Sequence, residues 1–103
     1  MPKNKKKPQQ NISDPIQFKE LGNKAFINKN FEEAIEMFTK AIDLDQSNPI
    51  FFSNWASCYF ELSQFDKSVA DCNEAIKLNP QFIKGYYKKA LALREQLKEE
   101  EAI

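Results

Sequence analysis

Histidine is absent from this chain of 103 residues. Nucleophile systems that pair serine or cysteine with histidine, and the usual zinc sites, depend on an imidazole, so the chain lacks the means for them. Glycine is also scarce, and Gly22-Asn23-Lys24 lacks both the glycine spacing and the following serine or threonine of a phosphate-binding loop. The sequence therefore predicts no enzyme, no catalytic or metal-binding residues, and no cofactor.

Long apolar runs are missing as well. No run approaches the ~18 to 20 residues that cross a bilayer, and the lysine-rich N-terminus is not followed by the apolar stretch of a secretory signal. We therefore expect a small domain with no membrane partner, located in the cytoplasm or the nucleus. The two cysteines, Cys58 and Cys72, are expected to be buried, reduced thiols.

Net charge is zero, with 15 basic and 15 acidic residues, but four lysines gather at Lys3, Lys5, Lys6 and Lys7. Residues 1–13 have too little apolar content to order themselves, and we expect them to form a flexible basic arm. The lysines could serve as a nuclear address or contact nucleic acid. The favoured interpretation is a solubilising tail or a linker from a longer protein, so no nucleic-acid partner is predicted.

What the chain does contain is a repeat with a period of 34 residues. Large and small residues recur together at this interval, as Phe18, Phe52 and Tyr86 in one register and Gly22, Ala56 and Ala90 in another. This is the length of a helix-turn-helix unit that buries its apolar face by stacking on a neighbour. The pattern is identified as the tetratricopeptide repeat, which predicts an all-α fold of antiparallel helix pairs in a short right-handed solenoid.

Residues 14–103 are expected to form one domain of five helices. It divides into repeat 1 at 15–48, repeat 2 at 49–82, and a partial third repeat or capping helix at 83–103. Ser13 or Asp14 is expected to cap the first helix, with Pro15 at its first position. The later helices are expected at Phe31–Leu44, Pro49–Leu62 and Phe65–Leu78, and from near Phe82 to the end. About three repeats are usually needed for stability, so we expect a marginally stable fold.

Five polar residues interrupt the first helices of the three units: Lys19, Asn23, Asn54, Lys84 and Lys88. Residues spaced by four share a helix face, and the first helices of such arrays line the concave surface. Three ammonium groups and two carboxamides would then meet in one groove. This combination favours a site for an anion, and specifically for a carboxylate.

The segments around these residues resemble the tetratricopeptide domains of co-chaperones over residues 15 to about 97. The segments are Lys19–Ala25, Phe52–Tyr59 and Phe82–Leu93. The resemblance implies that Lys19, Asn23, Asn54, Lys84 and Lys88 form a two-carboxylate clamp. It also implies, as the partner, the C-terminal Glu-Glu-Val-Asp tail of cytosolic 70- or 90-kilodalton heat-shock chaperones. Relatives of this type include Hsp-organising proteins, the tetratricopeptide phosphatase and large immunophilins.

The last clamp position is commonly arginine in that family, and here it is Lys88. Lysine keeps the charge but loses the planar fork, so weaker or less directional binding is expected. The resemblance also places Phe26 and Glu61 beside the groove that reads the preceding ligand side chains. For Phe26, packing between helices is an equally weighted interpretation. The recurring aromatic residues are expected in the core: Phe18, Phe52, Trp55, Tyr59 and Tyr86.

Two alternatives remain open at this point. The repeats could be a scaffold for an unrelated partner, or the recognition domain of a longer enzyme such as a phosphatase or a prolyl isomerase. In each case we expect a monomer that acts through protein–protein interaction.

Overall fold

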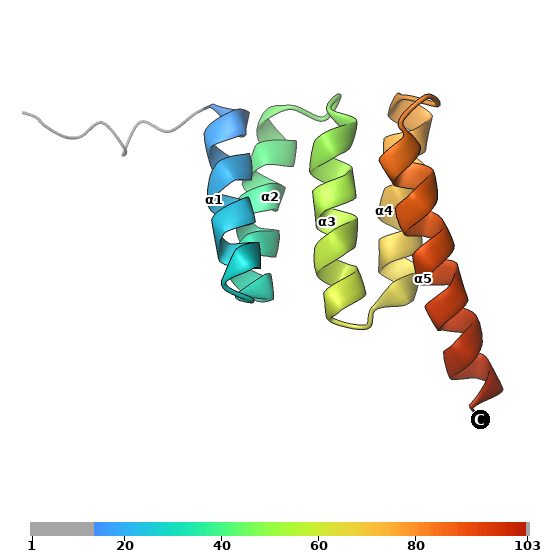
Figure 1. Ribbon diagram of the computed structural model, residues 1–103. Helices are drawn as coiled ribbons and strands as arrows, with labels where there is room; N and C mark the ends of the chain where they lie inside the picture. The colour runs from blue at the N-terminus through green and yellow to red at the C-terminus, as the bar shows by residue number, and fades with distance from the viewer. Residues whose placement is uncertain (1–13, 103) are drawn as a thin grey trace, which may run out of the picture.

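The computed structural model describes residues 14–102, so the basic arm expected at residues 1–13 lies outside the described part of the chain. Figure 1 shows the helices in chain order. They are α1 (Pro15–Ile27), α2 (Phe31–Leu44), α3 (Pro49–Glu61), α4 (Phe65–Leu78) and α5 (Ile83–Glu101). The described residues form no strand. The predicted all-α fold of five helices is confirmed.

Two of the helices begin at side-chain caps that the sequence makes visible. The Asp14 carboxylate accepts a hydrogen bond from the backbone N–H of Ile16 at 2.9 Å, and the Asn48 amide oxygen accepts one from Ile50 at 2.9 Å. Each cap is followed by proline at the first helical position, where the missing N–H costs nothing. Of the two residues predicted to cap α1, Asp14 is the N-cap, and Ser13 lies outside the described residues.

A residue in the left-handed conformation follows the first helix of each of the two complete repeats, two positions after the helix ends. Lys29 has φ 64° and Ser63 has φ 60°. After α1, Asn30 donates its backbone N–H to the Ala25 carbonyl, and Lys29 donates to Phe26, which is the Schellman arrangement of hydrogen bonds. The same pattern recurs after α3. The chain can therefore reverse within three residues, and each second helix packs antiparallel to the first.

The core alternates large and small side chains between the helices. Phe38 on α2 and Phe51 on α3 are fully buried, and Ala34, Ala41 and other small residues surround them. Gly22 on α1 lies against the Phe38 ring so closely that a Cβ atom would overlap it. Close approach of α1 and α2 therefore requires a glycine at this position.

Both cysteines are buried and unbonded, as the sequence predicts. Burial raises the pKa of the Cys58 thiol to about 12 and that of the Cys72 thiol to about 11. Because the thiolate is the reactive form, both residues act as small apolar groups at neutral pH.

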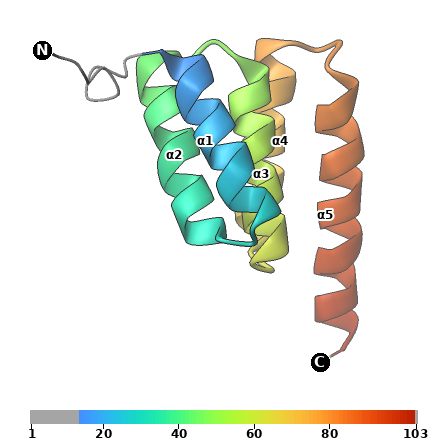
Figure 2. The same cartoon turned by 60° about the vertical axis from the view of Figure 1, so that its left-hand side comes forward.

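The helices stack so that α1, α3 and α5 lie on one side, with α2 and α4 behind them (Figures 1 and 2). Each helix contacts the next in the chain, and α3 also contacts both α1 and α5. Among the described residues, no helix is both long enough and apolar enough to cross a membrane.

The prediction that Tyr86 belongs to the core is wrong, because its side chain is 48% exposed. It lies in the first turn of α5, where its hydroxyl group donates to the backbone carbonyl of Pro80 in the preceding loop at 2.9 Å, in an exposed position. The C-terminal turns of α5 extend beyond α4 (Figure 2). Phe18, Phe52, Trp55 and Tyr59 are half-buried rather than fully enclosed. Trp55 nevertheless packs against both groups of buried residues around α2, as a core residue should.

Candidate functional site

Three hollows lie along α3, with α5 beside all three and α1 beside two of them, and all three are lined by Lys88. The clamp hollow, of about 190 Å³, is lined by Asn23, Phe26, Phe38, Asn54, Ser57 and Lys88. The end hollow, of about 330 Å³, includes Ser53, Asn54, Asn79, Gln81, Lys84 and Lys88. The apolar hollow, of about 190 Å³, includes Phe26, Phe60, Glu61, Tyr87, Lys88 and Leu91. Because neighbouring hollows share lining residues, together they form one groove that runs along α3, from Ile50 in the end hollow to Glu61 in the apolar hollow.

Four of the five predicted clamp residues line this groove. Asn23, Asn54 and Lys88 come from three different helices and line the clamp hollow. Lys84 joins Asn54 and Lys88 in the end hollow, one helical turn before Lys88. Lys19 is half-buried on α1, one turn before Asn23, and lines none of the three hollows. The tertiary fold thus brings together the amides and two of the ammonium groups.

Lys88 lies deep enough to feel the low polarity of the groove. Burial lowers the pKa of its ammonium group, and the nearby charge of Lys84 lowers it further. Its Nζ donates to the Ser53 carbonyl at 3.4 Å, which is long for a hydrogen bond. A bound anion would offset both the burial and the repulsion between the two lysines.

Ser53 is a polar residue of the site that the sequence analysis did not single out. It is 1% exposed, its hydroxyl has no hydrogen-bond partner in the described structure, and it lines the end hollow. Buried hydroxyl groups are normally paired, so this unpaired one is a polar group of the groove wall whose hydrogen bond is unmade. The sequence signal that could have revealed it was the position of Ser53, next to the predicted clamp residue Asn54 and after the apolar residues that begin α3.

Phe26 and Glu61, predicted beside the groove, both line the apolar hollow. Phe26 also packs edge-on against Phe31, with ring centroids 5.2 Å apart, and against the buried core. Its two interpretations, packing and groove wall, are therefore compatible. Phe60, Tyr87 and Leu91 complete the wall, and the sequence analysis missed them because their contact depends on how α3 meets α5.

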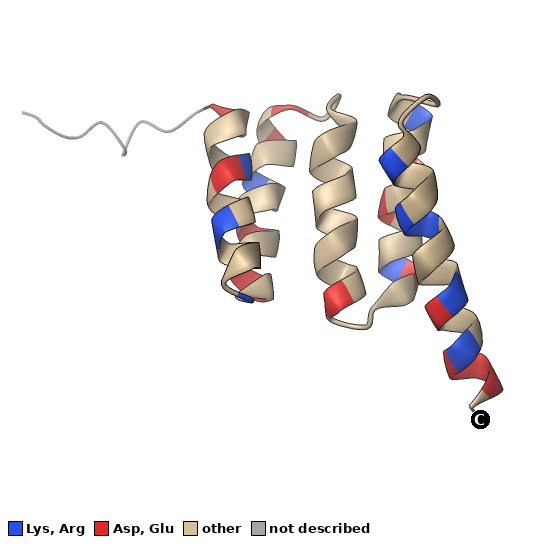
Figure 3. Cartoon of the chain, in the orientation of Figure 1, with Lys and Arg blue, Asp and Glu red and all other residues tan. Residues whose placement is uncertain are grey.

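The charges are unevenly placed along the groove. Figure 3 shows basic residues on α1 and α5, whereas α3 between them carries a single charge, that of Glu61 near its C-terminal end. Among residues 14–102, no three potential metal-ligating side chains of histidine, cysteine, aspartate or glutamate gather in a cluster. The groove thus offers amides and ammonium groups at one end and apolar surface with one carboxylate at the other.

Comparisons with known proteins point to one family. Two sequence models of the tetratricopeptide repeat match residues 20–48 and 49–82. Heat shock protein STI1 of Saccharomyces cerevisiae is 42% identical over 71 residues, which are 68% of this chain and 12% of that protein. Human RNA polymerase II-associated protein 3 is 42% identical over 84 residues, which are 82% of this chain and 13% of that protein. The chain therefore spans only a small part of these curated relatives.

Solved structures extend the comparison to bound ligands. The first tetratricopeptide domain of Spaghetti (RPAP3), bound to the HSP90 peptide SRMEEVD, is 39% identical with a TM-score of 0.80, covering 86% of this chain and 71% of that one. The second such domain of human RPAP3, in complex with the HSP70 peptide SGPTIEEVD, is 30% identical with a TM-score of 0.77. It covers 85% of this chain and 73% of that one.

Proposed function

The chain belongs to the tetratricopeptide repeat family, and from that premise we propose that it is a co-chaperone-type interaction domain. Its ligand is the C-terminal Glu-Glu-Val-Asp tail of a 70- or 90-kilodalton heat-shock chaperone. The observation that carries the proposal is the clamp hollow, where Asn23, Asn54 and Lys88 meet from three helices beside Lys84. Similar domains bound to peptides that end in EEVD support it.

The groove offers distinct donors for the two carboxylates of a terminal aspartate. Asn23 and Asn54 supply amide N–H groups for one carboxylate, with Lys19 reaching from the preceding turn of α1. Lys84 and Lys88 supply ammonium groups for the other. Charge-assisted hydrogen bonds of ~1.5 to 3 kcal/mol each offset the desolvation and ordering of the tail. We expect micromolar affinity, which corresponds to ~8 kcal/mol of binding free energy.

The domain acts by binding rather than by catalysis, and the same proposal places it in the cytoplasm or nucleus. None of the donors in the groove is positioned as a nucleophile with its own base. The role of the ligand-facing groups is to hold a chain end in place.

A labelled SRMEEVD peptide, titrated with the domain while fluorescence anisotropy is recorded, tests the proposal. We expect micromolar affinity that weakens with added salt, because the contacts are charged and Lys84 is exposed to solvent. The same peptide with an amidated C-terminus should bind at least tenfold more weakly. Equal binding of the acid and the amide would rule out a carboxylate clamp.

Two variants, each of which replaces a lysine by glutamate, test whether the peptide binds in the groove. Lys84→Glu places a carboxylate in the end hollow and should abolish measurable binding. Lys77→Glu makes the same change on the exposed last turn of α4, outside all three hollows, and should leave affinity within about twofold. Far-ultraviolet circular dichroism checks that both variants remain helical. Equal losses in the two variants would place the peptide elsewhere.

A further inference from the structure

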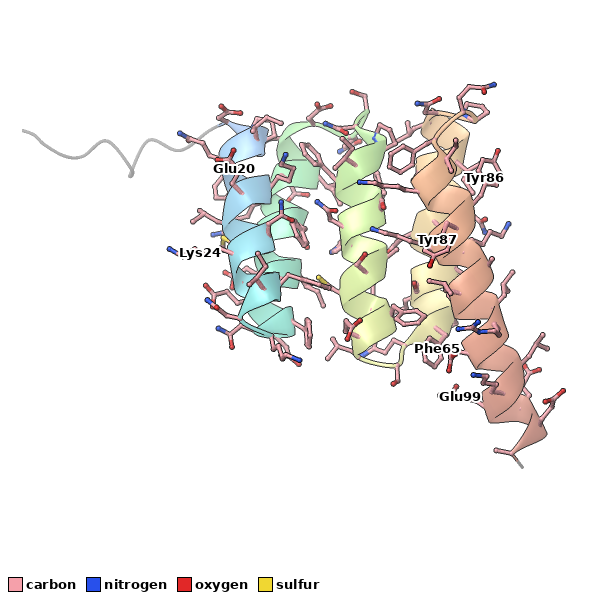
Figure 4. The ribbon with its side chains drawn as sticks, in the orientation of Figure 1. Glu20, Lys24, Phe65, Tyr86, Tyr87 and Glu99 are labelled. Carbon is pink, nitrogen blue, oxygen red and sulfur yellow. The ribbon has the colours of Figure 1, made fainter. Side chains whose placement is uncertain are left out.

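The groove changes character along α3. Asn54 stands at the donor-rich end, whereas Glu61, two turns later, lines the apolar hollow together with Phe26, Phe60 and Leu91. Lys88 is the other charged residue that lines this hollow, and its ammonium group contacts the Ser53 carbonyl toward the donor-rich end. Tyr87, labelled on α5 in Figure 4, adds an aromatic wall.

The carboxylate of Glu61 is available for an electrostatic interaction with a ligand. Its side chain is exposed, and among residues 14–102 it takes part in no ion pair. No other charged residue lies on α3 to neutralise it. A ligand side chain in the apolar hollow therefore meets a negative charge at its edge.

The distance along α3 sets which ligand residue this is. An α-helix rises 1.5 Å per residue, so Glu61 lies about 10 Å beyond Asn54 along the helix axis. An extended peptide advances about 3.3 Å per residue. A ligand whose last residue is held at Asn54 therefore presents the residue about three places earlier, the fourth from its C-terminus, to Glu61. In SRMEEVD that residue is a glutamate.

We propose that Glu61 is a specificity-determining residue that selects against an acidic side chain at the fourth position from the ligand's C-terminus. The inference rests on the proposed function of the groove. The preferred ligand is a C-terminal segment that ends in aspartate, carries a neutral or basic fourth residue, and has a large apolar residue next to it for the hollow. The Glu-Glu-Val-Asp tail binds, but against repulsion at one position.

Three peptides separate this effect from general binding. SRMEEVD is compared with SRMQEVD, changed at the fourth position from the end, and with SRMEQVD, changed at the third. At low salt the wild-type domain should bind SRMQEVD about two- to fivefold more tightly than SRMEEVD, which is the range for one exposed charge pair. The change at the third position should have the smaller effect.

Variants of the domain complete the test. Glu61→Gln should remove the preference for SRMQEVD, and Glu61→Lys should invert it, so that SRMEEVD becomes the tighter ligand. The matched control is Glu20→Gln, because Glu20 is exposed on α1 and lines none of the three hollows of the groove (Figure 4). That variant should keep the wild-type preference.

The outcomes distinguish this inference from the proposed function. If binding needs the free C-terminal carboxylate but the wild type does not distinguish SRMEEVD from SRMQEVD, the assignment to Glu61 is overturned and the clamp stands. A preference that survives in Glu61→Lys overturns it too, as does a larger effect at the third position. If no peptide with a free C-terminus binds, both proposals fail.

Discussion

Gly22 is the residue on which the close contact between α1 and α2 depends most directly. Phe38 fills the space that a side chain would need, and Phe38 is itself enclosed at 1% exposure. Gly85 on α5 is less crowded, because a Cβ atom there would meet Ile76 Cγ1 at 3.0 Å, a contact that a movement of a few tenths of an ångström would relieve.

Gly22→Ala is therefore expected to destabilise the fold by about 1 to 3 kcal/mol through overpacking. Gly85→Ala is the control, and it should be neutral or stabilising, because alanine favours helix by ~1 kcal/mol over glycine. Urea unfolding followed by circular dichroism measures both. Similar stability of the two variants would show that Phe38 can move aside.

Asp71 on α4 lowers the stability of the folded state by an amount that depends on pH. Burial, and then the charge of Glu74, raise the pKa of its carboxyl group to about 7, while Lys67 partly opposes the shift. One carboxylate oxygen is buried without a hydrogen-bond partner in the described structure. The folded state thus binds the proton more tightly than the unfolded state, whose pKa is near 3.8.

Stability should therefore fall as the pH rises from 3.8 to about 7. Partial solvent access limits the loss to about 1 to 2 kcal/mol. Asp71→Asn should remove this pH dependence and be more stable than the wild type at pH 8. Urea unfolding at several pH values tests this, and the wild type and the variant following parallel curves would contradict the prediction.

At the level of elements, the turns after α1 and α3 hold the antiparallel pairs together. Both place a non-glycine residue in the left-handed region, which disfavours an L-residue by roughly 1 to 2 kcal/mol. The Schellman hydrogen bonds and the packing of the following helix impose this conformation. Each turn therefore contains a small strain that a better residue would relieve.

Ser63→Gly is expected to stabilise the fold by about 0.5 to 1 kcal/mol, the gain from relieving the strain less the added entropy of the unfolded chain. Ser63→Val is the opposite test and should destabilise it, because a β-branched residue tolerates positive φ poorly. Ser63 is exposed, so neither change alters the core. Melting temperatures that shift the same way in both variants would contradict this account.

At the scale of the whole molecule, the stack is held by contacts between neighbours along the chain. The groove runs along α3 and is flanked by α1 and α5, and the direct contacts among these three helices are few compared with those within each antiparallel pair. Leu93 and Leu97 on α5 are exposed. A ligand that contacts α1, α3 and α5 together adds contacts that link these helices, and the free domain has few such contacts.

Peptide binding should therefore raise the melting temperature. At 100 times the dissociation constant, SRMEEVD stabilises the folded state by about 2.7 kcal/mol, or about 10 °C or more for a domain of this size. The amidated peptide is the control and should give almost no shift. A high melting temperature that no peptide changes would contradict both the marginal stability and the clamp.

The sequence by itself determined the elements. Asp14, Asn48 and the prolines after them fix helix starts through contacts within three residues, and the repeat places Asn23, Asn54 and Lys88 on the first helices. Their positions in the groove could be predicted for this reason, whereas their role in binding stays a prediction. All the residues that produce such a local signal lie in one short stretch of the chain, so the sequence alone reveals it.

The tertiary structure alone decided what depends on residues far apart in the chain. The burial of Asp71, the unpaired hydroxyl of Ser53 and the exposure of Tyr86 are set by how neighbouring helices meet, and no local pattern reports them. Likewise, Tyr87 and Phe60 became one wall only where α5 crosses α3. Burial and electrostatic environment depend on contacts between helices that are far apart in the chain. A local sequence pattern therefore does not reveal them, and the packed structure does.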